Sequence, residues 1–253
     1  MKISSTELQN NFGKYLMLAA HEDIIVTRNG TEIAKLSGII DESSDFVTVS
    51  KSKSNKVMEQ PAPYNVEGRK ATFEEYMELV EHSEDRYEYI DGEIYLLASP
   101  RTAHQIAQIE LTVILYNWFR GSKCTPLVAP YDIKLYRSPE RKNVVQPDIM
   151  VICDLEEHLD ENDYYQGIPS LVVEIISESS RRKDLVKKLD LYMCCGIKEY
   201  WIVNPLNKEI TVYLFENQSI SQNVTYKNNE IAHSFLFSGL AVELAAIFKG
   251  STP

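Results

Sequence analysis

The sequence has no long apolar run and no cysteine pattern typical of a metal site. No stretch of the 253 residues approaches the ~18 consecutive apolar residues that indicate a membrane-spanning helix. The N-terminus, MKISSTELQNNFG, has no continuous apolar core of the kind found in signal peptides. The four cysteines include no CxxC pair, so we expect reduced, largely buried thiols without zinc or disulfides. Together these absences predict a cytoplasmic protein with no membrane segment.

Basic residues are also too few to balance the acidic ones. The formal net charge of -11 argues against a protein that coats nucleic acid through bulk electrostatics. Local basic clusters are nevertheless present, at Arg137, Arg141 and Lys142 and again at Arg181, Arg182, Lys183, Lys187 and Lys188. Each cluster is either a DNA-contacting surface or an ordinary solvated face, and the sequence leaves both readings open.

The first forty residues have the pattern of a helix followed by a hairpin. Ser4 and Glu7 have the spacing of a capping box, and Asn29-Gly30 separates two short β-prone runs in IIVTRNGTEIAKLSG. The apolar residues that recur at helical spacing between these signals are Leu8, Phe12, Tyr15, Leu16 and Ala19. A small α+β unit is therefore predicted.

This N-terminal segment resembles the Phd/YefM (prevent-host-death) antitoxin family through ISSTELQNNFGKYL and IIVTRNGTEIAKL. The resemblance implies a domain over residues 1–45 that forms a homodimer, binds operator DNA and has a toxin as a possible partner. A module that only dimerises is the alternative. Residues 46–69 are rich in Ser, Lys, Pro and Asn and are predicted to be a linker, with a second domain at residues 70–253.

The second domain alternates strand and helix signals. Thr72 and Glu75 mark a helix start, and Asp91-Gly92 marks a hairpin in YEYIDGEIYLLA. A helix is expected from His104 to Arg120, with Ile106, Ile109, Val113 and Tyr116 or Asn117 along one side, and another from about Ser180 to Cys195. Strands with two inserted helices predict a mixed β-sheet flanked by helices, an α/β (α+β) fold.

Two carboxylates lie on apolar runs of this domain. Asp148 begins the run IMVIC, and Glu174 lies within LVVEII, where a charge is costly unless it is paired or binds a metal. If the two strands are neighbours, the carboxylates supply the oxygen ligands that Mg²⁺ or Mn²⁺ prefers. The alternative is a structural ion pair with a buried Arg or Lys.

Lys188 is predicted to face the same place from the next helix. At about 100° per residue, Leu185, Leu191 and Tyr192 all lie close to Lys188 around the helix, so the lysine lies on the apolar side. A lysine there can point inward to Glu174 and stabilise an anionic transition state. Snorkelling of the side chain from the edge of that face is the alternative.

Roughly residues 70 to 250 resemble the Uma family of restriction endonucleases, a bacterial branch of the PD-(D/E)xK nuclease superfamily. The matching segments are RYEYIDGEIYLLASP, VAPYDIKL, NVVQPDIMVICD, PSLVVEIISESSRRKD and KLDLYMCCGIKEYWIVNP. The resemblance implies a restriction-endonuclease-like fold with Glu88, Asp148, Glu174 and Lys188 as catalytic residues. Asp148 and Glu174 would bind the metal. The superfamily lysine two residues after the second acid is replaced by Ile176, and Lys188 matches the alternative, displaced position.

These observations predict a Mg²⁺- or Mn²⁺-dependent endonuclease that hydrolyses phosphodiester bonds in DNA. The residues expected to contact DNA are His104, Gln146, Arg181 and Arg182. The rival hypothesis is a catalytically inactive regulator that uses a nuclease fold to bind DNA or a toxin. Cleavage that depends on Asp148 would distinguish the two.

Overall fold

The computed structural model of the chain divides into two compact units, Met1–Tyr64 and Asn65–Pro253, which we describe separately. The residues that the structure describes are 2–4, 8, 15, 19, 23–28, 31–37, 68–177 and 183–248. Most of the predicted linker, together with Arg181 and Arg182, lies outside them. Within these described ranges, no helix is long and apolar enough to cross a lipid bilayer.

The N-terminal unit contains a three-stranded sheet. Its strands are β1 (Lys2–Ser4), β2 (Ile24–Arg28) and β3 (Thr31–Leu36). The β2–β3 hairpin matches the sequence prediction, whereas β1, which pairs in parallel with β2, was not predicted. Ile3, Tyr15 and Val26 belong to the core of the unit, and Leu8, Tyr15 and Ala19 are helical, as expected. The remaining residues of the predicted helix lie outside the described part of the chain.

The larger unit is built around a six-stranded mixed sheet. Its strands, in spatial order, are β14 (Ser219–Lys227), β13 (Glu209–Glu216), β12 (Glu199–Asn204), β11 (Leu171–Ile175), β10 (Ile149–Ile152) and β7 (Thr125–Val128). Only β11 and β12 pair in parallel. The two predicted acid-bearing strands, β10 and β11, are direct antiparallel neighbours, and every residue of both is buried.

A second, antiparallel sheet of five strands lies beside it. In spatial order the strands are β4 (Arg69–Lys70), β6 (Glu93–Leu96), β5 (Tyr87–Ile90), β9 (Arg141–Val145) and β8 (Ile133–Ser138). The predicted β5–β6 hairpin is confirmed, and its turn residues Asp91 and Gly92 have φ angles of 49° and 81°. Positive φ at both turn positions is what a two-residue type I′ hairpin requires.

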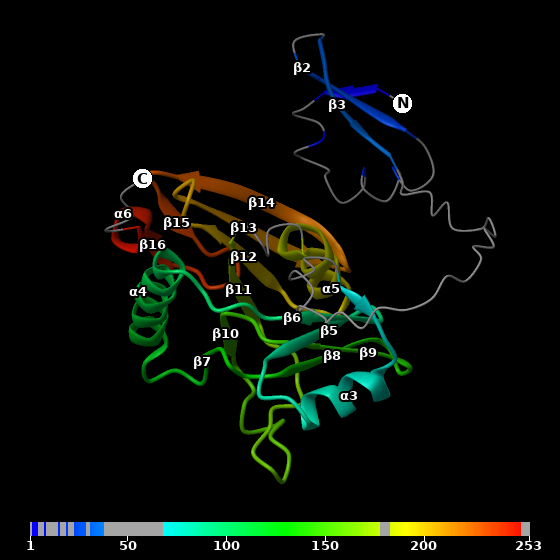
Figure 1. The fold of residues 1–253 in the computed structure, drawn as a ribbon. Helices are drawn as coiled ribbons and strands as arrows, with labels where there is room; N and C mark the ends of the chain where they lie inside the picture. Colours follow the sequence, from blue (N-terminus) through cyan, green and yellow to red (C-terminus); the bar gives the residue numbers. More distant parts are fainter. Residues whose placement is uncertain are drawn as a thin grey trace, which may run out of the picture. The chain divides into compact units, whose positions relative to one another are not determined.

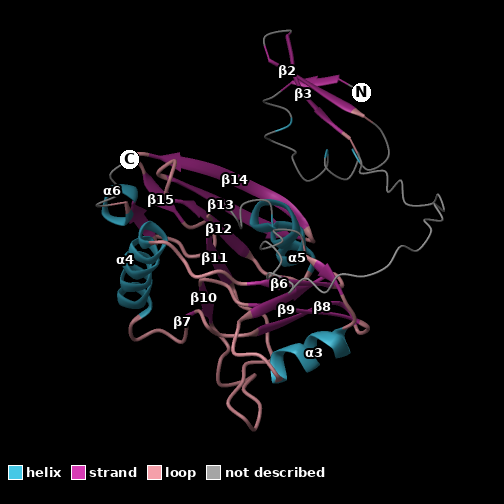
Figure 2. Cartoon of the chain, in the orientation of Figure 1, coloured by secondary structure: helices cyan, strands magenta, loops and turns pink. Residues whose placement is uncertain are grey.

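The helices cover different faces of the two sheets (Figures 1 and 2). Helices α4 (Thr102–Phe119) and α6 (Leu244–Ile247) share one core cluster with one face of the six-stranded sheet. The π-helical turn η1 (Lys183–Lys188) leads into α5 (Leu189–Cys194), which packs on the opposite face. Helix α3 (Phe73–Glu81) covers the outer face of the five-stranded sheet and has the predicted capping box at Thr72. The short strands β15 (Ile231–His233) and β16 (Ala241–Glu243) complete the unit.

Helix α4 buries a different side from the one that the sequence predicted. Ile109, Val113 and Tyr116 are 61%, 51% and 58% exposed. The buried positions are Ala107, Leu111, Leu115 and Phe119. Because α4 is apolar on nearly all sides, helical spacing alone does not show which side faces the sheet.

The cysteine prediction was wrong for two of the four residues. Cys124 and Cys153 form a disulfide, while Cys194 and Cys195 are free. Cys124 precedes β7 and Cys153 follows β10, and the register of this antiparallel pair sets Thr125 opposite Ile152. The two cysteines are 29 residues apart in sequence. Only the strand pairing brings them together, so neither composition nor spacing reveals the bond.

Candidate active site

Glu88 enters the site from the five-stranded sheet. Tyr87 and Tyr89 pack with the α3 cluster, whereas Ile90 belongs to the core between the two sheets. Because side chains alternate along a strand, Glu88 shares the inner face with Ile90. Its side chain is completely buried, and its Oε1 accepts a hydrogen bond of 3.0 Å from the backbone N–H of Gln146. Glu88 therefore faces the interior between the two sheets and not the solvent.

Glu174 enters from the six-stranded sheet by the same rule. Val173 and Ile175 on β11 point into the α4 core, and Val172 points into the opposite core beneath α5. Glu174 alternates with Val173 and therefore faces α5, with 4% of its side chain exposed. The two glutamates thus meet where the two sheets and α5 converge.

Lys188 lies between these two carboxylates. Its Nζ is 2.7 Å from Glu88 Oε1 and 2.7 Å from Glu174 Oε1, and only 3% of its side chain is exposed. The predicted inward direction of Lys188 is confirmed, and snorkelling is excluded because the amine is buried. One turn further along, the hydroxyl of Tyr192 donates to the same Glu174 oxygen at 2.6 Å. We call Glu88, Glu174 and Lys188 the acid–lysine triad.

Burial makes each member of the triad depend on the others. Two carboxylates and one ammonium are removed from water together, and the desolvation cost of each ion is offset only by close oppositely charged partners. Lys188 is the cation that touches both acids. Its position is therefore fixed by charge as well as by the packing of Leu189 and Leu191 beside it.

Asp148 occupies the end of β10 beside the triad. The antiparallel register pairs Ile149 with Val173, and one further step sets Asp148 opposite Glu174. Asp148 Oδ2 accepts a hydrogen bond of 2.7 Å from the backbone N–H of Ile175 and lies 3.1 Å from His104 Nε2.

Two buried polar atoms near Asp148 have no hydrogen-bond partner among the described residues, namely His104 Nδ1 and Gln146 Oε1. The side-chain amide of Gln146 donates a hydrogen bond from Nε2 to Asp132 Oδ1 at 2.8 Å. Buried polar atoms are normally satisfied by protein or water. Each of these two residues can therefore make one further polar contact, to water or to a bound ligand.

The donor set fits a hydrated divalent ion rather than a closed protein cage. Asp148 and Glu174 offer carboxylate oxygens from neighbouring strands, and Gln146, two residues before Asp148, has a buried side-chain oxygen with no partner among the described residues. Over the described ranges, no group of three or more His, Cys, Asp or Glu residues has a metal-holding arrangement. Mg²⁺ keeps several waters and is commonly held by one or two carboxylates. Asp148 and Glu174 are therefore compatible with Mg²⁺.

The structure brings together most of the residues singled out in the sequence. Glu88, Glu174 and Lys188 are in direct contact, and Asp148, His104 and Gln146 form the adjoining part. Arg181 and Arg182 lie outside the described residues. Sequence reasoning placed Tyr192 beside Lys188 on the apolar side of the helix but did not assign it to the site. It also left out Asp132, which holds the Gln146 amide.

Comparisons with known proteins match the larger unit. A family model named Uma2, described as "Putative restriction endonuclease", matches residues 73–245. A solved structure titled as a putative nuclease belonging to DUF820, from Anabaena variabilis, superposes with a TM-score of 0.58 at 18% identity. The matched region covers 70% of this chain and 97% of the chain in that structure. At this identity the likeness shows the fold, which is restriction-endonuclease-like as predicted.

Two curated proteins from Synechocystis sp. are also similar. "Uncharacterized protein slr1290" is 28% identical over 141 residues, which are 55% of this chain and 72% of that protein. "Uncharacterized protein sll1609" is 24% identical over 168 residues, which are 65% of this chain and 93% of that protein. The names of these relatives state no activity, so they add similarity and no assignment of function.

Proposed function

The chain belongs to the Uma2 family of restriction-endonuclease-like proteins, and from this we propose that it is a metal-dependent endonuclease that hydrolyses phosphodiester bonds in DNA. The observation that carries the proposal is the position of Lys188, whose Nζ lies 2.7 Å from both Glu88 and Glu174. The proximity of Asp148 supports it, because the register sets this second acid opposite Glu174.

In the proposed reaction, Asp148 and Glu174 would hold Mg²⁺ or Mn²⁺. When bound, such an ion polarises the scissile phosphate and lowers the pKa of an attacking water. His104 fixes the carboxylate of Asp148 through Nε2, and the N–H of Ile175 holds the same oxygen. These contacts orient Asp148 before substrate arrives, and this preorganisation limits the reorganisation needed during the reaction.

Lys188 would supply positive charge where negative charge develops on the reacting phosphate. Donors aimed at developing charge are worth a few kcal/mol in a water-excluded site, about 3 to 4 for one donor. Glu88 positions the ammonium, and Tyr192 donates to the Glu174 oxygen that also accepts from Lys188. Gln146, together with Arg181 and Arg182 from the segment after β11, would contact the DNA.

For the N-terminal unit we propose the role implied by its Phd/YefM resemblance, a homodimerisation domain at residues 1–45 that can also bind DNA or a toxin. Residues 46–69 would link it to the nuclease domain at residues 70–253. In this arrangement the family match, which begins at residue 73, falls entirely within the second domain.

The test is cleavage of plasmid and single-stranded DNA with Mg²⁺ or Mn²⁺. We expect Asp148→Ala to abolish cleavage, whereas Asp85→Ala, which removes an exposed carboxylate in the loop before β5, should leave it unchanged. Removing the metal ion with a chelator should likewise abolish cleavage by the wild type. If the wild type and Asp148→Ala both bind DNA but neither cleaves any of these substrates, the inactive-regulator hypothesis is favoured instead.

A further inference from the structure

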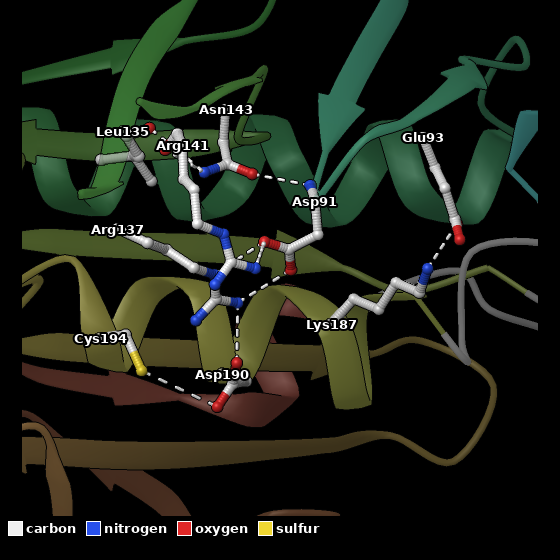
Figure 3. A network of polar contacts seen from close by, with 9 residues as sticks. All are labelled: Asp91, Glu93, Leu135, Arg137, Arg141, Asn143, Lys187, Asp190 and Cys194. Atoms are coloured by element: carbon white, nitrogen blue, oxygen red, sulfur yellow. Dashed lines mark hydrogen bonds and ion pairs between the residues drawn. The ribbon is translucent and has the colours of Figure 1, made fainter. Parts of the chain in front are cut away.

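A second polar network lies outside the acid–lysine triad and centres on Arg137 at the end of β8 (Figure 3). Its guanidinium binds Asp91 through two bonds, Nε to Oδ1 at 2.8 Å and Nη2 to Oδ2 at 3.0 Å. The same Nη2 lies 2.7 Å from Asp190 Oδ2. Only 12% of the Arg137 side chain is exposed. Arg137 is thus paired with two partly exposed acids, Asp91 (27% exposed) and Asp190 (44% exposed), although its sequence context suggested a basic surface.

Each of the two acids lies close in sequence to one member of the triad. Asp91 lies in the β5–β6 turn, three residues after Glu88, and its backbone N–H donates to Asn143 Oδ1 at 2.8 Å. Asp190 lies in the first turn of α5, two residues after Lys188. Arg137 therefore joins the hairpin that carries Glu88 to the helix that follows Lys188.

The residue on the other side of Lys188 is anchored to the same hairpin. Lys187 donates to Glu93 on β6 and to the hydroxyl of Tyr95 on β6 at 2.6 Å. The hairpin and the η1–α5 segment are thus connected on both sides of Lys188. The contacts that fix Lys187 and Asp190 therefore also constrain the direction of the Lys188 side chain, because Lys188 lies between them in the chain.

We propose that Arg137 is a positioning residue that sets Lys188 on Glu88 and Glu174 by holding Asp91 and Asp190 together. The inference rests on the proposed nuclease function. Without Arg137, two like charges face each other across the hairpin and α5, and α5 is pushed away from the hairpin. A displacement of about 1 Å at a reacting group lowers a rate by as much as ~10²-fold.

Arg141 provides a matched control within the same network. Its Nη2 lies 3.5 Å from Asp91 Oδ1, but its side chain is 65% exposed, and among the described residues Asp91 is its one ion-pair partner. Removing Arg141 takes away a positive charge beside the same acid and leaves the connection to α5 in place. Any effect specific to Arg137→Met and absent from Arg141→Met therefore reports on that connection.

The first measurement is the kinetics of DNA cleavage. We expect Arg137→Met to lower kcat at least tenfold with KM for DNA within about twofold of wild type, because the misplaced group acts on the transition state. Arg141→Met should keep both constants. Replacing Asp190 by Asn in the Arg137→Met background should restore part of kcat, since it removes the repulsion. Equal kcat values for the two arginine variants would overturn the proposal.

The second measurement does not depend on cleavage. Lys188 is buried and should resist acetylation by an amine reagent under native conditions, with exposed Lys198 as the internal rate reference. Peptide mass spectrometry measures the labelling rate of Lys188. In Arg137→Met this rate should exceed the rate expected if Lys188 became accessible only through global unfolding of that variant, and in Arg141→Met it should equal the wild-type rate. Labelling that follows global unfolding alone contradicts the proposal. If wild type cleaves no DNA, the nuclease function fails, and this measurement still decides the role of Arg137.

Discussion

The buried lysine is the residue on which both stability and the proposed chemistry depend. Lys188 is surrounded by Glu88, Glu174 and, through Glu174, by Tyr192. A lysine in this environment is held by two acids, and its removal leaves two carboxylates buried together. Catalytic and structural consequences of substituting Lys188 are therefore separate effects, and both are measurable.

We predict that Lys188→Met abolishes cleavage and also lowers the free energy of unfolding at pH 7 by about 3 to 5 kcal/mol. The stability loss arises because Glu88 and Glu174 lose their shared cation. Urea denaturation measures it. The double substitution Lys188→Met with Glu88→Gln should recover part of the lost stability and none of the activity.

Lys198→Met is the control for this prediction, because Lys198 is exposed at the end of the loop before β12. It should change the unfolding free energy by less than about 0.5 kcal/mol. If Lys188→Met were as stable as Lys198→Met, the described burial of the triad would be wrong.

At the scale of elements, the η1–α5 segment matters because it places Lys188 where the two sheets converge. Its first half is a π-helical turn, a form that occurs frequently at functional sites. Adjacent Lys187 and Lys188 reach different partners, Glu93 in one case and the triad glutamates in the other. The sequence predicts one helix from about Ser180 and has no local signal for the π turn.

The link between Lys187 and Glu93 predicts a pH dependence of stability. Burial alone would raise the pKa of Glu93, but hydrogen bonds from Lys187 and Tyr95 and the charge of Lys187 hold it below the ordinary 4.5. Because the folded-state pKa is depressed, ionised Glu93 stabilises the fold above about pH 4.5. This stability is lost as the pH falls through the lower folded-state value.

We therefore expect Glu93→Gln to lower the unfolding free energy by about 0.5 to 1 kcal/mol at pH 7, since the pair is partly exposed. The difference from wild type should shrink steadily as the pH drops below 4.5. Thermal unfolding between pH 3 and pH 7 measures it. A difference that is constant over this range would contradict the ionic link, and Glu84→Gln in the exposed loop before β5 is the matched control.

At the scale of the whole molecule, the two units can be separated experimentally. The larger unit, Asn65–Pro253, contains the whole candidate site and every residue matched by the family model. Its core comprises two clusters on the two faces of the six-stranded sheet and a third cluster beneath α3. The proposed dimerisation role belongs to the other unit.

We predict that a protein beginning at Asn65 unfolds cooperatively and retains metal-dependent cleavage of DNA, because no residue of the site lies before this point. Light scattering coupled to size-exclusion chromatography should give a dimer for the full chain and a monomer for the shortened one. A shortened protein that is still dimeric would place the interface in the larger unit and contradict the proposed role of residues 1–45.

The sequence was most informative where a local pattern has one physical solution. Asp91-Gly92 fixed a hairpin because both positions need positive φ, and Thr72 with Glu75 fixed a helix start through a capping box. Periodicity was less informative in α4. That helix is apolar on almost all sides, and the predicted apolar row of Ile109, Val113 and Tyr116 is exposed, whereas Leu111 and Leu115 face the core.

By itself, the sequence determined which groups must be paired. Glu174 within an apolar strand and Lys188 on an apolar helical side are costly to bury alone, so each required a partner. The tertiary structure decided which partners they found. Glu88, Tyr192, the Asp148–His104 contact and the Arg137 network all join residues that lie on different elements or across the core. Such contacts depend on strand register and sheet packing, which follow from the summed burial of the whole chain and not from any local pattern.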